Sequence, residues 1–287
     1  ALTTGQVPVV FDKTLPTLGS VSISSNNSTN TVATSGNTVT LAFTASEEIH
    51  KDHAAGDYAV TFKSGGDPIN DATITYDNPG GGNDFTATYT VAAGDTGGPI
   101  TFSIAFKDLA NNDGVPDTDV NGPSAVTLDK TLPSLTTVSI ASNRSPGTFA
   151  KPGDVVTLTM VANETISTPV VTFKSGGVAI TDTSIDYVNT TGNTWTAKYT
   201  ADASDIDGAV TFSAAISDLA GNLKTFTAVT SGGGSVQFDD TAPTVSDVSI
   251  ESNNSPGPKT HAKAGHVVTL SFTTSEAIAT PTAVFKS

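Results

Sequence analysis

The sequence predicts an all-β chain, on the basis of three observations. Apolar and polar residues alternate with a period of two, as in residues 38–44 and 100–106, which is typical of antiparallel strands with one packed face and one wet face. Glycine (26) and proline (15) are frequent between these stretches and favour turns there. No apolar period of 3.6 residues continues for the length of a helix.

A short segment recurs and divides the chain. It reads FDKTLP at 11–16, LDKTLP at 128–133 and FDDTAP at 238–243. The aspartates of these segments, at positions 12, 129 and 239, are 117 and 110 residues apart, and the residues between them align outside one insertion and a single further residue. Such periodicity indicates homologous modules in series. We interpret the segment as a short proline-containing linker that restricts hinge motion.

Each full repeat contains seven candidate strands, which we letter A to G in chain order, so that the F–G loop, for example, joins the sixth strand to the seventh. In the first repeat we expect them at 20–24, 38–44, 58–64, 72–77, 84–91, 100–106 and 124–128. The expected inward positions are Val39, Leu41, Phe43, Phe85, Ala87, Tyr89, Val91, Ile100, Phe102, Ile104 and Phe106, and in the second repeat Trp195, Ala197, Tyr199, Val210, Phe212, Ala214 and Ile216. Seven such strands indicate an immunoglobulin-like β-sandwich.

The predicted organisation is therefore a tandem of immunoglobulin-like seven-stranded β-sandwiches joined by short linkers. Residues 1–11 match the last strand of a preceding domain. Complete domains are expected at 12–128 and 129–238, and residues 239–287 match the N-terminal part of a further domain. We expect the chain to be a window on a longer array.

The segments D-x-T-x-P, VSI, GDVVTL, SE-x-I, VTF-x-SGG, W-x-A-x-Y and SDLAGN together resemble the bacterial immunoglobulin-like repeats of large surface and biofilm adhesins. The resemblance covers the whole chain. It implies an extracellular stalk or spacer, on the cell surface or secreted, whose ligand-binding activity often lies in other domains. It also implies calcium bound between modules, with the neighbouring repeats of the same chain as partners.

Composition narrows the function classes. The chain carries 13 Lys and Arg against 28 Asp and Glu, a formal net charge of −15, which disfavours nucleic acid and anionic membranes as partners. Cysteine is absent, so there is no disulfide framework or thiolate site. No apolar stretch approaches the length of a membrane helix. No nucleophile elbow, zinc-protease motif, P-loop or dinucleotide fingerprint occurs, so we expect no enzyme activity.

Recurring oxygen-bearing side chains predict a calcium site at each junction. Immunoglobulin topology places the linker, the B–C loop and the F–G loop at one pole of a domain. The side chains expected there are Asp12, Asp129 and Asp239 of the linkers, Glu47, Glu164 and Glu276 after the second strand, Asp108 with Asn112, and Asp218 with Asn222. The preceding domain would add oxygens from its E–F loop, namely Asp95 in the first repeat, or Asp202, Asp205 and Asp207 in the second. Carboxylate and amide oxygens suit calcium, whereas the alternative is that these residues only form turns.

Two other groups are weaker candidates. A six-residue insertion in the first repeat includes His50, Asp52, His53 and Asp57; a histidine pair with a carboxylate could bind zinc, but no third ligand is fixed by spacing and a solvated loop is favoured. In the first F–G loop, Asp113, Asp117 and Asp119 could hold a second calcium ion, although their spacing differs from that of an EF-hand.

Two alternatives to the adhesin stalk remain open at this point. The chain could be a subunit of an extracellular filament or sheath, with other copies as partners. It could instead be an accessory module of a secreted polysaccharide-degrading enzyme. The full-length protein would separate these functions, because a secretion signal with many repeats favours the adhesin and a catalytic domain favours the enzyme.

Overall fold

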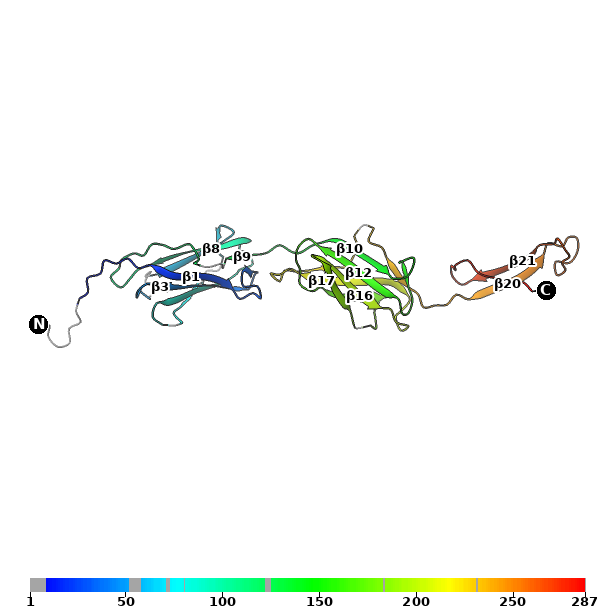
Figure 1. The fold of residues 1–287 in the computed structure, drawn as a ribbon, viewed down its shortest axis with the longest axis horizontal. Helices are drawn as coiled ribbons and strands as arrows, with labels where there is room; N and C mark the ends of the chain where they lie inside the picture. Colours follow the sequence, from blue (N-terminus) through cyan, green and yellow to red (C-terminus); the bar gives the residue numbers. More distant parts are fainter. Residues whose placement is uncertain are drawn as a thin grey trace.

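The computed structural model describes residues 9–51, 58–70, 73–79, 81–121, 125–182, 184–230 and 232–286. These residues form strands, turns and loops without any helix. Two β-sandwiches and a two-stranded hairpin follow one another along the long axis, and the chain begins at one end of this row (Figure 1). We call residues 12–128 the first module, 129–238 the second module and 239–286 the third segment.

The first module packs two sheets against each other. One sheet has the strand order β1 (Leu18–Ser25), β3 (Thr38–Ala45), β7 (Asp84–Thr90) and β6 (Thr75–Asp77), all antiparallel. The other has the order β2 (Val32–Ala33), β9 (Val126–Leu128), β8 (Gly98–Phe106), β4 (Tyr58–Ser64) and β5 (Asp67–Pro68), with β2 parallel to β9. This is the strand order of an immunoglobulin-like sandwich.

The second module repeats this arrangement. Its first sheet is β10 (Leu135–Ser142), β12 (Val155–Ala162), β16 (Thr194–Thr200) and β15 (Asp186–Thr191). Its second sheet is β11 (Phe149–Ala150), β19 (Val236–Phe238), β17 (Gly208–Ser217), β13 (Val170–Ser175) and β14 (Val178–Ala179), with β18 (Leu223–Phe226) added on β17. The predicted fold class, tandem immunoglobulin-like β-sandwiches, is confirmed.

The alternating residues of the facing sheets form one core in each module. Leu41 on β3 and Leu158 on β12 are fully buried. The ring centroids of Phe62 and Tyr89 lie 4.8 Å apart, and those of Phe173 and Tyr199 are also 4.8 Å apart. The predicted inward positions are buried except Trp195, which is half-buried at the edge of the second core.

The recurrent Ser-Gly-Gly after β4 and β13 is explained by a tight turn. Gly65 and Gly176 have φ values of 59° and 55°, a backbone conformation that glycine adopts without strain. A Cβ atom on Gly176 would lie 2.6 Å from the Asp207 carbonyl oxygen. The turn therefore needs glycine both for its backbone angle and for its close approach to the E–F loop.

The structure differs from the expected strands in the short elements. The strand expected at 72–77 is described only at Thr75–Asp77, and residue 72 lies outside the described residues. The two-residue strands β2, β5, β11 and β14 and the strand β18 were not predicted, because such short pairings leave no apolar period in the sequence. Residues 1–8, part of an expected strand, are outside the described residues, and residues 9–11 form no strand.

The third segment forms the antiparallel pair β20 (Val245–Ser252) and β21 (Val268–Thr274). Its apolar face is exposed: Val248 and Ile250 are 62% and 60% exposed, whereas their counterparts Val138 and Ile140 in the second module are 1% and 4% exposed. This pair corresponds to the first two long strands of each complete module.

Adjacent modules touch directly at the first junction. The Asn27 amide Nδ2, in the loop after β1, donates a hydrogen bond of 2.8 Å to the Ala220 carbonyl in the second module. Lys130 Nζ of the linker donates to the carbonyls of Ala93 and Asp95 in the first module, at 2.7 and 2.9 Å. Protein contacts alone therefore tie the linker to the module before it and the two modules to each other.

Candidate metal centre

Three carboxylates from separate parts of the second module meet at its linker end. Asp129 lies in the linker before β10, Glu164 follows β12, and Asp218 follows β17. One oxygen of each lies within 4.8 Å of the other two. The first module repeats the cluster with Asp12, Glu47 and Asp108. We call these two groups the acidic clusters. Each brings together residues that we expected at one pole of a module.

Backbone pairing between loops brings the glutamates to the clusters. Ile49 pairs with Asp108, and Ile166 pairs with Asp218, as isolated antiparallel bridges. Ile49 and Ile166 are 0% and 5% exposed, so burial of each isoleucine anchors the loop that carries a glutamate two residues earlier. The recurrent Glu-x-Ile spacing is therefore a structural requirement of the site.

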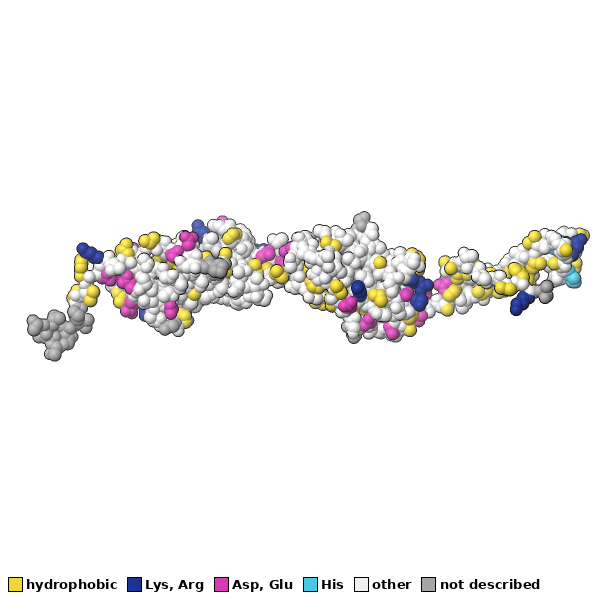
Figure 2. Space-filling view, viewed as in Figure 1, with side chains coloured by type: hydrophobic (Ala, Val, Ile, Leu, Met, Phe, Trp, Pro, Cys, Tyr) yellow, Lys and Arg dark blue, Asp and Glu magenta, His cyan; other side chains and the backbone are white. Residues whose placement is uncertain are grey.

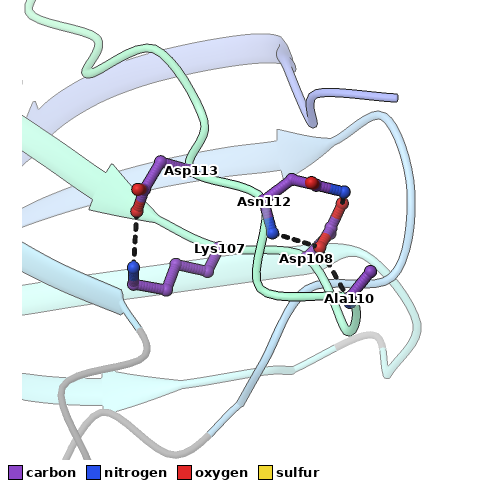
Figure 3. Close-up of polar contacts among 5 residues, drawn as sticks. All are labelled: Lys107, Asp108, Ala110, Asn112 and Asp113. Atoms are coloured by element: carbon purple, nitrogen blue, oxygen red, sulfur yellow. Dashed lines mark hydrogen bonds and ion pairs between the residues drawn. The ribbon is translucent and has the colours of Figure 1, made fainter. Parts of the chain in front are cut away.

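The F–G aspartates are buried and held by a ring of donors. In the first module, Asp108 Oδ1 accepts hydrogen bonds of 2.8 Å from the backbone N–H groups of Ala110 and Asn112, and its Oδ2 accepts one of 2.8 Å from Asn112 Nδ2 (Figure 3). Desolvation alone would raise the pKa of Asp108, but the Asn112 and Ala110 hydrogen bonds and the nearby His50 outweigh it and lower this pKa. The buried carboxylate is thus kept ionised.

Asp218 occupies the same place in the second module. Its Oδ1 accepts from the N–H groups of Gly221 and Asn222 at 2.7 and 2.9 Å, and its Oδ2 accepts from Asn222 Nδ2 at 2.8 Å. It is 3% exposed. The equivalent five-residue loop, Asp-Leu-Ala-x-Asn, therefore brings an oriented carboxylate to each acidic cluster.

The linker aspartates are oriented by their own turns. Oδ1 of Asp12, Asp129 and Asp239 accepts a hydrogen bond of 2.8, 2.9 and 3.0 Å, respectively, from the N–H group two residues later. Each therefore forms an Asx turn. Among the described residues, the second oxygen of each carboxylate has no hydrogen-bond donor, which leaves it available to a cation.

Glu47 shows the electrostatic cost of the cluster. Desolvation raises the pKa of Glu47, and the negative charges of Asp12 and Asp108 raise it further. The shift means that ionisation of Glu47 is less favourable here than in a fully solvated side chain. A bound cation would remove the repulsion and favour the ionised form.

Asn112 and Asn222 do not offer the oxygen that was expected of them. The amide nitrogen of Asn112 faces the Asp108 carboxylate, and it also lies 3.3 Å from the Thr14 carbonyl of the linker. Asn222 Nδ2 likewise donates to the Asp129 carbonyl at 3.2 Å. Among the described residues, Oδ2 of each aspartate accepts a hydrogen bond only from this amide, so the N–H side of the amide turns toward it. These asparagines therefore position the aspartate and the linker.

Asp95 and Asp205 do not join the acidic clusters. Both are buried in the E–F loop of their own module. Asp95 accepts hydrogen bonds from the Asn70 backbone N–H at 2.7 Å and from the Ala92 N–H at 2.9 Å, and Asp205 accepts from the Thr181 N–H at 3.0 Å. Their oxygens close local turns, because buried carboxylates need donors close at hand.

The third segment contains Asp239 and Glu276, which line a cavity of about 560 Å³ beside the second module. Glu276 Oε1 is buried and has no hydrogen-bond partner in the described part of the chain. No third acidic residue among those described joins this pair in a cluster. Asp239 and Glu276 thus line the same cavity at the second junction.

The weaker candidates do not assemble into sites among the described residues. Asp52, His53 and Asp57 lie outside the described residues, so the zinc hypothesis is not addressed. Asp113 forms an ion pair of 2.6 Å with Lys107 (Figure 3). Asp113, Asp117 and Asp119 do not converge in a described acidic group.

No protein-family model and no curated protein matches the sequence. Similar solved structures include an I-band fragment of titin, 11% identical, covering 88% of this chain and 83% of that chain with a TM-score of 0.39. They also include another titin tandem, 14% identical, covering 79% and 66% with a TM-score of 0.32, and a marsupial T cell receptor, 15% identical, covering 80% and 77% with a TM-score of 0.37. At these scores the likeness carries no functional conclusion. Among the described residues, no helix is long and apolar enough to cross a membrane.

Proposed function

We propose that the chain is a non-enzymatic stalk segment of a microbial surface adhesin or biofilm matrix protein, stiffened by calcium at its module junctions. The observation that carries the proposal is the same acidic cluster at the linker end of two successive modules. The resemblance of the repeats to bacterial immunoglobulin-like adhesin modules supports the extracellular location.

The chemistry of each acidic cluster fits calcium. Calcium binds six to eight oxygens at about 2.3–2.6 Å, so two of its ligands lie at most about 5 Å apart. The three carboxylates of each cluster meet this limit, with oxygens within 4.8 Å of one another. Desolvation and the negative charges of Asp12 and Asp108 raise the pKa of Glu47, and a divalent cation would offset the part that comes from charge repulsion. Bound calcium would supply this positive charge and bridge the carboxylates.

The residues would act mechanically. Asp129 belongs to the linker, whereas Glu164 and Asp218 belong to loops of the module that follows. A cation shared by the three would fix the direction in which the linker enters that module. Asn222 already links the Asp218 carboxylate to the Asp129 carbonyl. A row of such joints would hold a distal binding domain away from the cell.

Calcium titration tests the proposal. Isothermal calorimetry and thermal unfolding of the chain in EDTA and in calcium should show binding and a higher melting temperature with the metal. At a calcium concentration of 100 times Kd, mass action stabilises a module by about 2.7 kcal/mol. Asp218→Asn and Glu164→Gln should each remove the response of the second module.

Asp186→Asn is the matched control, because it removes one exposed carboxylate on β15, away from the acidic cluster. It should leave the calcium response unchanged. If the unmodified chain shows no binding heat and no change in melting temperature at millimolar calcium, the calcium part of the proposal is wrong and only the spacer remains.

A further inference from the structure

The loop after the first strand of each module faces the acidic pole of the next module. At the first junction, Asn27 Nδ2 donates to Asn37 Oδ1 at 3.0 Å and to the Ala220 carbonyl at 2.8 Å. Ala220 stands two residues after Asp218 of the second acidic cluster. It is 4% exposed, whereas its counterpart Ala110 in the first module is exposed. Position 27 is therefore a contact between successive modules.

The second module carries a cation at the equivalent position. Alignment of SISSN (22–26) with SIASN (139–143) places Arg144 where Asn27 stands and Asp154 where Asn37 stands. Arg144 pairs with Asp154 at 3.7 Å, so the amide pair of the first module has become an ion pair. By the same alignment, Lys151 replaces Thr34.

Arg144 and Lys151 share a cavity with acidic residues on the other side of the second junction. Both line the cavity of about 560 Å³ that Asp239 and Glu276 also line. Figure 2 shows basic and acidic side chains gathered where the second module meets the third segment. The unpartnered, buried Glu276 Oε1 belongs to this cavity. Opposite charges are therefore placed together at this joint.

In the described part of the chain, the loop after β1 brings no such counter-charge to the first junction. Its acidic cluster of Asp129, Glu164 and Asp218 faces the neutral Asn27 loop. The nearby cation, Lys130, is bound to carbonyl groups of the first module. At the corresponding linker position the second junction has Asp240, whose N–H group donates to Asp207 at 2.7 Å. The first and second junctions, called the first and second joints below, thus differ in the charges that each side contributes.

We propose that Arg144 and Lys151 are a built-in counter-charge for the acidic pole of the next repeat, so that the second joint is held by ion pairing and needs no divalent cation. The first joint, with Asn27 and Thr34 in these places, depends on one. The calcium dependence of the first joint rests on the proposed function, whereas ion pairing at the second joint does not. One array would then contain joints with different sensitivity to calcium and salt.

The absence of cysteine makes the test clean. A spin-label pair at Thr61→Cys and Thr172→Cys reports the first joint, and a pair at Thr172→Cys and Ser271→Cys reports the second; all three side chains are exposed on strands. The width of the distance distribution, measured by pulsed electron paramagnetic resonance, gives the rigidity of each joint. It is measured in EDTA or calcium, at 0.05 and 0.5 M NaCl.

We expect calcium to narrow the distribution at the first joint and to leave the second unchanged. In EDTA, raising NaCl to 0.5 M shortens the Debye length from about 14 Å to about 4 Å and should broaden the second distribution. Arg144→Asn with Lys151→Thr should broaden it already at low salt and make it respond to calcium. The reciprocal change, Asn27→Arg with Thr34→Lys, should reduce the calcium response of the first joint.

The outcomes separate the two proposals. If neither joint responds to calcium, the proposed calcium function fails, but broadening of the second joint by Arg144→Asn with Lys151→Thr in EDTA still supports the ion pairing. If that double variant leaves the second distribution unchanged in EDTA at low salt, the counter-charge proposal is overturned whatever calcium does. An equal calcium response at both joints of the unmodified chain also overturns it.

Discussion

Replacing Asn222 by alanine removes a side chain that holds two parts of one acidic cluster. Its Nδ2 donates to Asp218 Oδ2 at 2.8 Å and to the Asp129 carbonyl at 3.2 Å. Asp218 is only 3% exposed, so water replaces the lost donor poorly. A hydrogen bond to a charged group contributes about 1.5–3 kcal/mol, and we expect the free energy of unfolding of the second module to fall by about 2 kcal/mol.

Urea unfolding followed by Trp195 fluorescence measures this change. The chain has one tryptophan, and Trp195 packs against the core of the second module. With an m-value of about 2 kcal/mol/M, the transition midpoint should fall by about 1 M. Asn112→Ala makes the same change in the first module and should leave the Trp195 transition in place. A midpoint shift below about 0.2 M for Asn222→Ala, or an equal shift for Asn112→Ala, would refute the reasoning.

Three further predictions follow from charge and packing. Desolvation and the charges of Asp12 and Asp108 raise the pKa of Glu47. Ionisation of Glu47 therefore destabilises the first module as the pH rises past the ordinary pKa of glutamate. Glu47→Gln should raise the melting temperature in EDTA at pH 7 and diminish the increase in melting temperature that calcium gives. Hydrogen bonds outweigh desolvation and lower the pKa of Asp108, so the stability it contributes is present at neutral pH and is lost as the pH falls below about 4. Asp108→Asn should flatten that acid limb in melting curves, and a steep limb in the variant would contradict the assignment. Leu158 is 0% exposed, so Leu158→Ala should lower the free energy of unfolding of the second module by about 2–5 kcal/mol. Urea unfolding followed by Trp195 fluorescence measures this loss. A loss below about 1 kcal/mol would contradict the assignment of Leu158 to the core.

The long strands could be predicted from sequence because they alternate. Val39, Leu41 and Phe43 occupy every second position of β3 and are all buried. The short parallel strand β11 could not be predicted, since its two residues, Phe149–Ala150, pair with β19 far along the chain. Local periodicity carries no information about such distant pairings.

The acidic clusters could be predicted from the sequence, because the recurrent acidic residues lie on loops that immunoglobulin topology places at one pole of the module. Asp129, Glu164 and Asp218 meet as that topology requires. The role of Asn222 could not be predicted from the sequence, because the neighbouring atoms decide whether an amide presents its oxygen or its nitrogen. Asp95 illustrates the same limit, since its hydrogen bonds to Asn70 and Ala92 depend on the detailed path of the E–F loop.

The central claim is that calcium binds at the two acidic clusters, where the linkers enter the first and second modules. Crystals grown with calcium, measured with anomalous scattering, test it most directly. The account predicts an anomalous peak about 2.3–2.6 Å from oxygens of Asp129, Glu164 and Asp218, and a second peak at the cluster of Asp12, Glu47 and Asp108. Unoccupied clusters in millimolar calcium, with the three carboxylates turned to separate surfaces, would contradict it.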